Sequence, residues 1–182
     1  IIKMVDIQSK HITKQYVSFD SIYNDIHTLY KKIKQIPVNI DCIVAIGTGG
    51  FIPARLIKNY IEVPVLTMTV SHYQDEVLQT KTKHIQLIQA ETEESKFIKG
   101  KNILVIDELD DTRTTLAYIT NKLLELQPNK IIVGVLHNKD KEKSGILDER
   151  VTYISSKKVK DKWIVYPWEV KDIDKHNKLS IL

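Results

Sequence analysis

Cysteine is nearly absent from this sequence, in which Cys42 is the only one among 182 residues. A single cysteine cannot form an internal disulfide or a thiolate metal cluster. No apolar run approaches the roughly 18 residues that a membrane-spanning helix needs, and residues 1–6 lack the pattern of a signal peptide. These absences argue against a membrane partner, and we expect a cytoplasmic protein.

Strong charge of one sign is also missing. Lysine and arginine number 27 against 23 aspartates and glutamates, which leaves a net charge of +4. Proteins that bind nucleic acid usually concentrate their positive charge in one patch. The mild excess therefore argues against a nucleic-acid partner, and it is compatible with an anionic small molecule without selecting one.

The composition is that of an ordinary globular protein, with 42% apolar and 27% charged residues, and it excludes a disordered chain. The sequence has neither internal repeats nor low-complexity segments. A chain of 182 residues corresponds to about one domain and is long enough to bury a substantial core. We therefore expect a single domain over residues 1–182.

Short apolar runs alternate with helical patterns along the chain. Between Ser18 and Pro37, isoleucine and leucine recur at spacings of three and four residues, which predicts an amphipathic helix. Strands alternating with helices indicate an α/β protein with a mainly parallel sheet, and ligands bind beyond the carboxyl ends of such strands. The other expected elements are strands at 42–46, 63–70, 102–106 and 130–136 and helices at 53–61 and 114–126. The expected strand ends are 47–50, 107–115 and 137–141.

Several segments have weaker patterns. For residues 1–10, which are apolar without a clear period, an edge strand is one interpretation. Residues 71–100 are polar with little strand character, so we expect a functional flap, with an exposed hairpin or helix as the alternative. Residues 151–154 and 163–166 predict short strands that cover one side, and residues 170–182 support no interpretation.

The segment from Asp107 to Thr115 carries the strongest functional signal, because acidic side chains and then threonines directly follow a buried strand. A helix N-terminus offers unpaired backbone N–H groups and a partial positive charge, which bind phosphate, and threonine hydroxyls add donors. The carboxylates could hold sugar hydroxyls or a hydrated Mg²⁺, which takes oxygen ligands. A solvated acidic turn with a capping box is the alternative. The residues concerned are Asp107, Glu108, Asp110, Asp111, Thr112, Thr114 and Thr115.

A glycine-rich turn follows the strand expected at 42–46. Gly47, Gly49 and Gly50 let the backbone approach a ligand or take a positive φ. The turn is not a dinucleotide fingerprint, because Ile52 stands at the sixth position, and it lacks the Gly-Lys-Ser/Thr of a Walker loop. By itself the signal is weak, since many turns between a strand and a helix contain glycine.

Aromatic residues cluster late in the chain, where Trp163 and Trp168 enclose an apolar segment. Packing in the core or in a lid is one interpretation, and a stacking platform for a planar base is the other. Lys139, just past a strand end, could donate to an exocyclic oxygen of such a base. Its charged neighbours, residues 140–143, are equally typical of a plain surface.

Together these segments resemble the type I phosphoribosyltransferases, specifically the purine-salvage hypoxanthine/guanine/xanthine branch. Residues 106–115 are similar to that family's binding motif for phosphoribosyl pyrophosphate (PRPP), residues 49–55 to its pyrophosphate loop, and residues 163–169 to the base-binding hood of its xanthine-guanine and fungal hypoxanthine-guanine members. The resemblance runs from about Asp41 to Glu169. It implies the α/β fold of that family, with a core at about 38–140, a hood from about 150–182 plus the N-terminal segment, and a homodimer or homotetramer.

The resemblance implies roles for the acidic residues. Asp107 and Glu108 would bind the ribose hydroxyls and, with Glu169, would hold Mg²⁺. Asp111 would be the general base that takes the purine N7 proton. The PRPP-binding residues would be Asp107, Glu108, Asp110, Asp111, Thr112, Arg113, Thr114 and Thr115, together with Thr48 and Gly49 at the pyrophosphate, where the peptide is often cis in the family.

For the purine base, the resemblance implies that Lys139 contacts the 6-oxygen, that Trp163 stacks on the ring and that the backbone at Ile164 reads its edge. A mobile flap over residues 71–83 would close over the site and exclude water from the reacting ribosyl centre. The flap residues concerned are Ser71, His72 and Tyr73.

The sequence departs from the family pattern at two positions. Many relatives have glycine in place of Arg113 and lysine or arginine in place of Thr48. We expect Arg113 to adopt a negative φ, and its guanidinium could pair with the 5′-phosphate. Without a cation at position 48, the pyrophosphate would be stabilised less unless Arg55 or a partner chain supplies the charge.

The leading hypothesis is a Mg²⁺- and PRPP-dependent transferase that converts a 6-oxopurine to its nucleoside monophosphate and pyrophosphate. The runner-up is a non-catalytic regulatory protein on the same fold that senses PRPP or a nucleotide, which the departures at Arg113 and Thr48 suggest. A third possibility is transfer to adenine or a pyrimidine. Lys139 argues for a 6-oxo group, because an ammonium donates to a carbonyl and not to an exocyclic amine.

Overall fold

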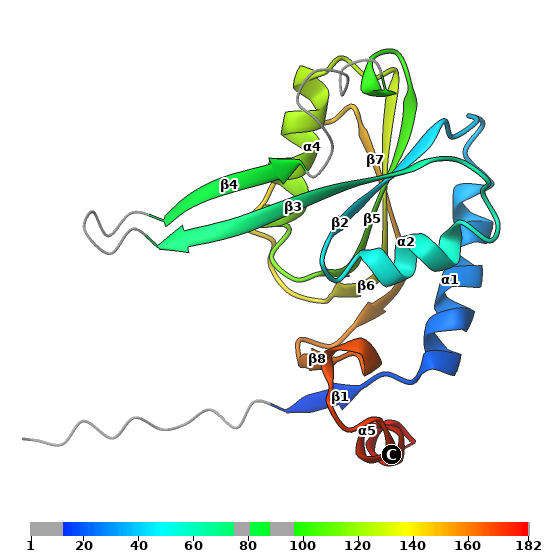
Figure 1. The fold of residues 1–182 in the computed structure, drawn as a ribbon, viewed down its shortest axis with the longest axis vertical. Coiled ribbons are helices and arrows are strands. Elements are labelled where there is room, and N and C mark those ends of the chain that lie inside the picture. Colours follow the sequence, from blue (N-terminus) through cyan, green and yellow to red (C-terminus); the bar gives the residue numbers. More distant parts are fainter. Residues whose placement is uncertain (1–12, 75–80, 88–96, 182) are drawn as a thin grey trace, which may run out of the picture.

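The structure is a computed structural model, and it describes residues 13–74, 81–87 and 97–181. Within these residues the main feature is a six-stranded sheet in the order β4-β3-β2-β5-β6-β7 (Figure 1). All adjacent strands are parallel except β3 and β4, which are antiparallel. The expected α/β fold with a mainly parallel sheet is therefore confirmed. The strands are β2 (Cys42–Gly47), β3 (Val65–Gln74), β4 (Lys81–Leu87), β5 (Asn102–Asp110), β6 (Lys130–Lys139) and β7 (Val151–Val159).

Helices cover both faces of this sheet. Helices α1 (Phe19–Ile33) and α2 (Phe51–Ile57) pack on one face, and α4 (Thr114–Glu125) packs on the other. The central strands β2, β5 and β6 are buried on both faces, as their continuous apolar runs predict. The two hydrophobic clusters thus lie on opposite sides of the same strands.

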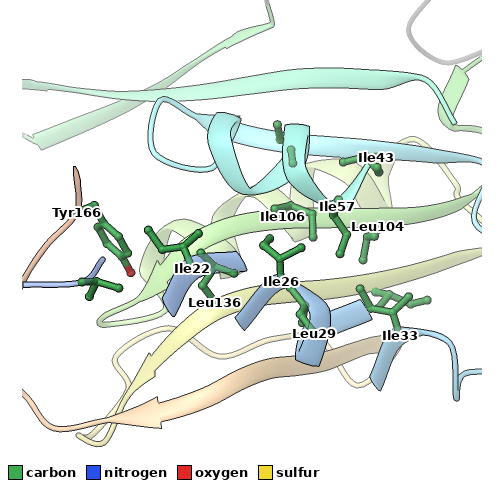
Figure 2. Close-up of a cluster of buried hydrophobic side chains, with 14 of the residues drawn as sticks. Ile22, Ile26, Leu29, Ile33, Ile43, Ile57, Leu104, Ile106, Leu136 and Tyr166 are labelled. Carbon is green, nitrogen blue, oxygen red and sulfur yellow. The ribbon is translucent and has the colours of Figure 1, made fainter. Parts of the chain in front are cut away.

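Helix α1 illustrates how local sequence determines an element. The Ser18 side chain caps its start by accepting a hydrogen bond from the N–H of Ser21 at 3.1 Å. Its apolar stripe is fully buried against the sheet (Figure 2), and each such isoleucine contributes about 1.5–3 kcal/mol of burial free energy. The helix ends at Ile33, just before the expected terminator Pro37. The buried stripe consists of Ile22, Ile26, Leu29 and Ile33.

A smaller layer, which we call the hood, is built from both ends of the described chain. Strands β1 (Lys14–Tyr16) and β8 (Trp163–Val165) pair in parallel, followed by the 3₁₀ turn η1 (Pro167–Glu169) and helix α5 (Ile173–Ser180). His176 joins α5 to the segment that follows β1, because its Nε2 lies 2.9 Å from the carbonyl oxygen of Val17. Figure 1 shows the hood below the carboxyl ends of β2, β5 and β6.

Several element boundaries differ from those expected. Helix α2 begins at Phe51, two residues before Pro53, and ends at Ile57 rather than Ile61. Strand β7 belongs to the main sheet and α1 packs on it, so the core extends beyond residues 38–140 on both sides. The C-terminal segment, which had no interpretation, contains α5. Among the described residues, no helix is long and apolar enough to cross a membrane.

The expected absence of strand character in residues 71–100 is wrong for part of that segment. Strands β3 and β4 form an antiparallel hairpin in which Ser71 pairs with His84, His72 with Lys83 and Tyr73 with Thr82 (Figure 1). Backbone pairing to the adjacent strand outweighs the weak local propensity of these polar residues. The expectations for residues 1–10, and for the parts of the flap at 75–80 and 88–96, lie outside the described residues.

Candidate active site

The carboxyl ends of three neighbouring strands form one continuous site edge. Strand β2 ends at the glycine turn, β5 leads into the acidic motif, and β6 leads into Lys139. The parallel register places Asp110 beside Asn138 and Leu109 beside His137. The sheet topology therefore brings together the strand ends expected from the sequence.

The glycine turn packs directly against the acidic motif. A Cβ added to Gly49 would overlap the carboxylate of Glu108, and one added to Gly50 would lie 2.6 Å from the carbonyl oxygens of Ile46 and Ile106. Glycine is required at Gly50, because the backbone of the turn passes so close to the backbone of β2 and β5. At Gly49 a side chain would instead displace the Glu108 carboxylate. The turn contains a cis peptide between Gly47 and Thr48, one bond earlier than the resemblance implied.

Neither Thr48 nor Arg55, the two residues considered for the pyrophosphate, brings a positive charge to this turn. Thr48 is exposed at the turn and carries a hydroxyl. The guanidinium of Arg55, considered as a substitute for the missing cation, donates instead to Asn59 Oδ1 at 2.8 Å on the last turn of α2. Within the described residues, the backbone of the turn is therefore what faces the site at this point.

Two adjacent carboxylates form the centre of the site. Burial and the neighbouring charge of Glu108 raise the pKa of Asp107 well above its usual range. Asp107 Oδ1 accepts the N–H of Glu108 at 2.9 Å, whereas Glu108 Oε2 is buried without a hydrogen-bond partner among the described residues. No ion pair within the described part of the chain neutralises either group. Such a pair favours a bound cation or hydroxyl donors, which would restore the ionised form of Asp107.

The residues considered as magnesium ligands are only partly assembled. Asp107 and Glu108 are neighbours on β5, and their oxygens suit Mg²⁺. Glu169 is exposed, and its Oε2 accepts the backbone N–H of Tyr166 at 3.1 Å. In the portions of the chain that the structure describes, no group of three or more His, Cys, Asp or Glu side chains is placed to hold a metal. A cation here would thus depend on two carboxylates completed by oxygens of water or substrate.

The loop from Asp110 to Thr115 is held in place by Lys143. The Lys143 ammonium donates to the main-chain oxygens of Asp110, Asp111 and Lys139 at 2.8, 2.9 and 2.9 Å. All three donors of the ammonium are thereby used, and burial lowers the pKa of Lys143. This role could not be predicted from the sequence, because Lys143 lies in a lysine-rich segment typical of a surface.

The expectation that Arg113 adopts a negative φ is wrong. Arg113 has φ 65° and forms the N-cap of α4 in the left-handed conformation, which costs a non-glycine residue about 1–2 kcal/mol. Its Nε and a terminal nitrogen donate to Asp110 Oδ2 at 3.0 and 2.7 Å, and its guanidinium lies 4.4 Å from the ring centroid of Tyr153. These contacts offset the cost of the left-handed backbone. The guanidinium is paired with Asp110 in this structure, where the sequence suggested a pairing with the 5′-phosphate.

The threonines lie where the helix begins. Thr114 is the first residue of α4, with Thr115 next to it, and the hydroxyls of Thr112 and Thr114 lie 3.0 Å apart. Gly145 donates its N–H to the Thr112 carbonyl at 3.0 Å. The helix N-terminus and its hydroxyls thus face the same edge as the carboxylates, in the arrangement that suits a phosphate group.

Asp111 is part of an ion cluster that includes Lys139. Its Oδ1 lies 3.0 Å from the Lys141 ammonium and 3.3 Å from that of Lys139, and both ammonium groups also approach Asp161, at 3.3 and 3.5 Å respectively. Burial alone would raise the pKa of Asp111, but the contacts with Lys141 and Lys139 outweigh it and lower the pKa. Asp111 is therefore an ionised carboxylate at neutral pH.

The hood presents an aromatic face near this cluster. Trp163 is 57% exposed, whereas Ile164 is buried and pairs in register with Gln15 of β1. An exposed tryptophan held by strand pairing offers a flat surface on which a planar ring can stack. Asp161, two residues before Trp163, approaches the Lys139 ammonium at 3.5 Å, so the end of β6 lies near the start of β8.

A buried hydrogen-bonded network behind the site was not foreseen. His137, on β6, is fully buried, and its Nδ1 lies 2.7 Å from the hydroxyl of Tyr166 while its Nε2 lies 2.9 Å from Asp25 Oδ2. The Tyr166 hydroxyl donates to the Glu108 carbonyl at 3.0 Å. The available sequence signal was the position of His137 at the expected strand end 137–141.

Comparison with known proteins agrees with this architecture. Residues 14–174 match the family model of the phosphoribosyl transferase domain. The chain therefore belongs to the phosphoribosyltransferase family, and the expected fold and enzyme class, a pentosyl-transferring glycosyltransferase, are confirmed.

Specific relatives support the same placement. The chain is 33% identical to the hypoxanthine-guanine phosphoribosyltransferase of Saccharomyces cerevisiae over 92% of this chain and 91% of that protein. It is 31% identical to xanthine phosphoribosyltransferase 1 of the same yeast over 92% and 95%. Among solved structures, a hypothetical protein from Neisseria gonorrhoeae with bound ppGpp is 36% identical, with a TM-score of 0.85 over 93% of this chain and 97% of that one.

Proposed function

We propose that this enzyme transfers the 5-phosphoribosyl group of PRPP to a 6-oxopurine, which is hypoxanthine, guanine or xanthine, in purine salvage. The observation that carries the proposal is the ion pair between Asp111 and Lys139, which joins the PRPP-type motif after β5 to the base-facing end of β6. The similarity to a hypoxanthine-guanine and a xanthine phosphoribosyltransferase supports the same substrate class.

Base selection follows from the donors at the end of β6 and in the hood. The Lys139 side chain is buried, and its ammonium can donate to a carbonyl oxygen. Adenine lacks such an oxygen at its 6-position. Trp163 would offer its exposed face to the purine ring, and the backbone of Ile164 on β8 would read the ring's edge. This chemistry favours a 6-oxopurine over adenine or a pyrimidine.

In the transfer step, a bond forms between a ring nitrogen of the purine and C1′ of the ribose, and the bond from C1′ to the pyrophosphate oxygen breaks. The purine releases one proton, and Asp111, which is already ionised, accepts it. As the base binds, Lys139 exchanges its contact with Asp111 for the 6-oxygen. That exchange removes one of the two ammonium contacts of Asp111 and leaves the one with Lys141. Asp111 thereby becomes a stronger base, because a paired carboxylate is a weaker proton acceptor.

Asp107 and Glu108 bind the two ribose hydroxyls and present oxygens to Mg²⁺. The buried, unpartnered Oε2 of Glu108 and the raised pKa of Asp107 support this fit, because both are relieved by a cation. When bound, Mg²⁺ supplies positive charge that stabilises the departing pyrophosphate. The 5′-phosphate is held by the backbone N–H groups and hydroxyls of the loop from Asp111 to Thr115.

The test is a spectrophotometric assay with PRPP and Mg²⁺ in which hypoxanthine, guanine, xanthine and adenine are offered separately. Turnover with at least one 6-oxopurine and none with adenine is expected. Asp111→Asn should keep PRPP binding by calorimetry and lose at least about tenfold in turnover, since general-base catalysis contributes more than that. The matched control is Asp20→Asn, at an exposed position in the first turn of α1. Clear binding of PRPP without turnover on any base would instead favour the non-catalytic sensor.

A second proposal concerns regulation of the same site. The relative from Neisseria gonorrhoeae, at 36% identity, was solved with bound ppGpp, a guanosine nucleotide that carries two diphosphates. We propose that such a nucleotide places its base against Trp163 and a diphosphate on the loop after β5, and therefore competes with PRPP. Inhibition that rising PRPP overcomes is expected, and inhibition independent of PRPP would contradict it.

The proposed oligomeric state rests on the family resemblance, and the proposed location on the near absence of cysteine and of long apolar runs. We propose a cytoplasmic homodimer or homotetramer. Light scattering coupled to size-exclusion chromatography measures the state directly, and a monomeric mass would exclude both forms.

A further inference from the structure

Tyr166 joins the hood to the main chain of the ribose-binding motif. Its ring is buried between Trp168 and His137, with ring centroids 4.7 and 5.6 Å away and interplanar angles of 7° and 18°. Its hydroxyl reaches the Glu108 carbonyl at 3.0 Å, and Figure 2 shows the ring at the end of the buried cluster. A residue of the hood therefore contacts β5 of the main sheet at one of the two proposed ribose-binding residues.

The Tyr166 hydroxyl is held from two sides. The Glu108 carbonyl can only accept, so the single phenolic proton of Tyr166 points toward it. The Tyr166 oxygen also lies within hydrogen-bond distance of His137 Nδ1, 2.7 Å away.

The other ring nitrogen of His137 contacts Asp25. Burial alone would raise the pKa of Asp25, but hydrogen bonds from His137 and Lys157 outweigh it and lower the pKa. The Asp25 carboxylate lies 2.9 Å from His137 Nε2 and 2.8 Å from the Lys157 ammonium. His137 thus bridges Asp25 of α1 and Tyr166 of the hood through its two ring nitrogens.

We infer that His137 and Tyr166 are positioning residues that lock the Glu108 peptide, and with it the Glu108 side chain, in the geometry that binds the ribose. The inference rests on the proposed function, since it assigns these residues to the PRPP site of that reaction. Two constraints act on Glu108: its carbonyl is held by Tyr166, and its carboxylate lies against Gly49. Tyr166 also donates its backbone N–H to Glu169, so this one residue contacts both Glu108 and Glu169, two of the residues considered as Mg²⁺ ligands.

The first experiment replaces Tyr166 by phenylalanine, which keeps the stacked ring and removes only the hydroxyl. We expect kcat/KM for PRPP to fall about tenfold or more, the loss typical of a hydrogen bond in a buried network, with KM for the purine unchanged within about twofold. The matched control is Tyr30→Phe, because Tyr30 stacks on Tyr60 and its hydroxyl makes no hydrogen bond within the described residues. A folded Tyr166→Phe variant with an unchanged kcat/KM for PRPP would overturn the inference, as would equal losses for both substrates.

The second experiment does not depend on catalysis. Calorimetry should show that Tyr166→Phe binds PRPP about tenfold more weakly than the wild-type protein, because a buried hydrogen bond is lost, while Tyr30→Phe binds it as the wild-type protein does. Equal PRPP affinity of Tyr166→Phe and the wild-type protein would overturn the lock on Glu108. If the wild-type protein bound PRPP and lost affinity in Tyr166→Phe but transferred no phosphoribosyl group to any base, the proposed function would fail and the network would stand.

Discussion

The Lys143 ammonium lies 2.9 Å from the main-chain oxygen of Asp111 and thereby fastens the loop that carries the proposed general base. The same ammonium holds the oxygens of Asp110 and Lys139, so one side chain sets the relative position of the loops after β5 and β6. The geometry of both substrate-facing loops thus depends on a residue that faces neither substrate.

Replacing Lys143 by methionine should therefore loosen the phosphate-binding loop without removing any group that touches substrate. We expect KM for PRPP to rise about tenfold, because hydrogen bonds from a charged donor to three carbonyls are lost. Steady-state kinetics with varied PRPP measure the change. Lys158→Met, at an exposed lysine whose ammonium lies 3.7 Å from Asp140, is the control and should change KM little. Equal KM values in the two variants would show that the loop holds its shape without Lys143.

The pKa of Asp111 should respond to Lys141. This lysine lowers the pKa of Asp111, so Lys141→Met should raise it toward the ordinary value of an aspartate. The base must be ionised to accept a proton. As the pH is lowered, the activity of Lys141→Met should therefore begin to fall at a higher pH than that of the wild-type protein. The acidic limb of the kcat profile is the measurement, and it should move upward while the plateau stays within about threefold. A downward shift or an unmoved limb would contradict the ion-pair assignment.

Two substitutions at Arg113 separate backbone strain from side-chain contacts. Arg113→Ala keeps a Cβ at φ 65° and loses the contacts with Asp110 and Tyr153, which should cost about 2 kcal/mol of unfolding free energy. Arg113→Gly loses the same contacts but relieves the strain, so it should be about 1 kcal/mol more stable than the alanine variant. Urea denaturation measures both. Equal stability of the two variants would mean that the left-handed conformation is not retained.

Alanine at Gly49 should displace the Glu108 carboxylate, whose atoms lie where the new Cβ would be. We expect kcat/KM for PRPP to fall about 100-fold, as is typical when a reacting group is misplaced by about 1 Å. Gly100→Ala is the matched control: Gly100 has φ 70° and open space around it, so this change strains the backbone far from the site. The control should lower the thermal midpoint and leave kinetics unchanged, and similar kinetics in both variants would refute the proposed contact.

The acidic motif shows what could be predicted from local sequence. An apolar run followed by Asp107 and Glu108 indicates a buried strand that delivers carboxylates to an edge, and β5 has that form. The strand extends further than expected, to Asp110, because pairing with β6 continues through that residue. The backbone of Arg113 could not be predicted, since the compensation for its left-handed φ comes from Tyr153 on another strand.

By itself the sequence determined the order of strands and helices and the positions of the strand ends, because hydrophobic periodicity and capping act between residues a few positions apart. The tertiary structure alone decided which side chains meet there. Asp25 and His137 are 112 residues apart in the chain, and their contact exists only because α1 packs over β6. A hydrogen bond depends on tenths of an ångström, and such distances are set by the packing of whole elements and are not encoded in any local pattern.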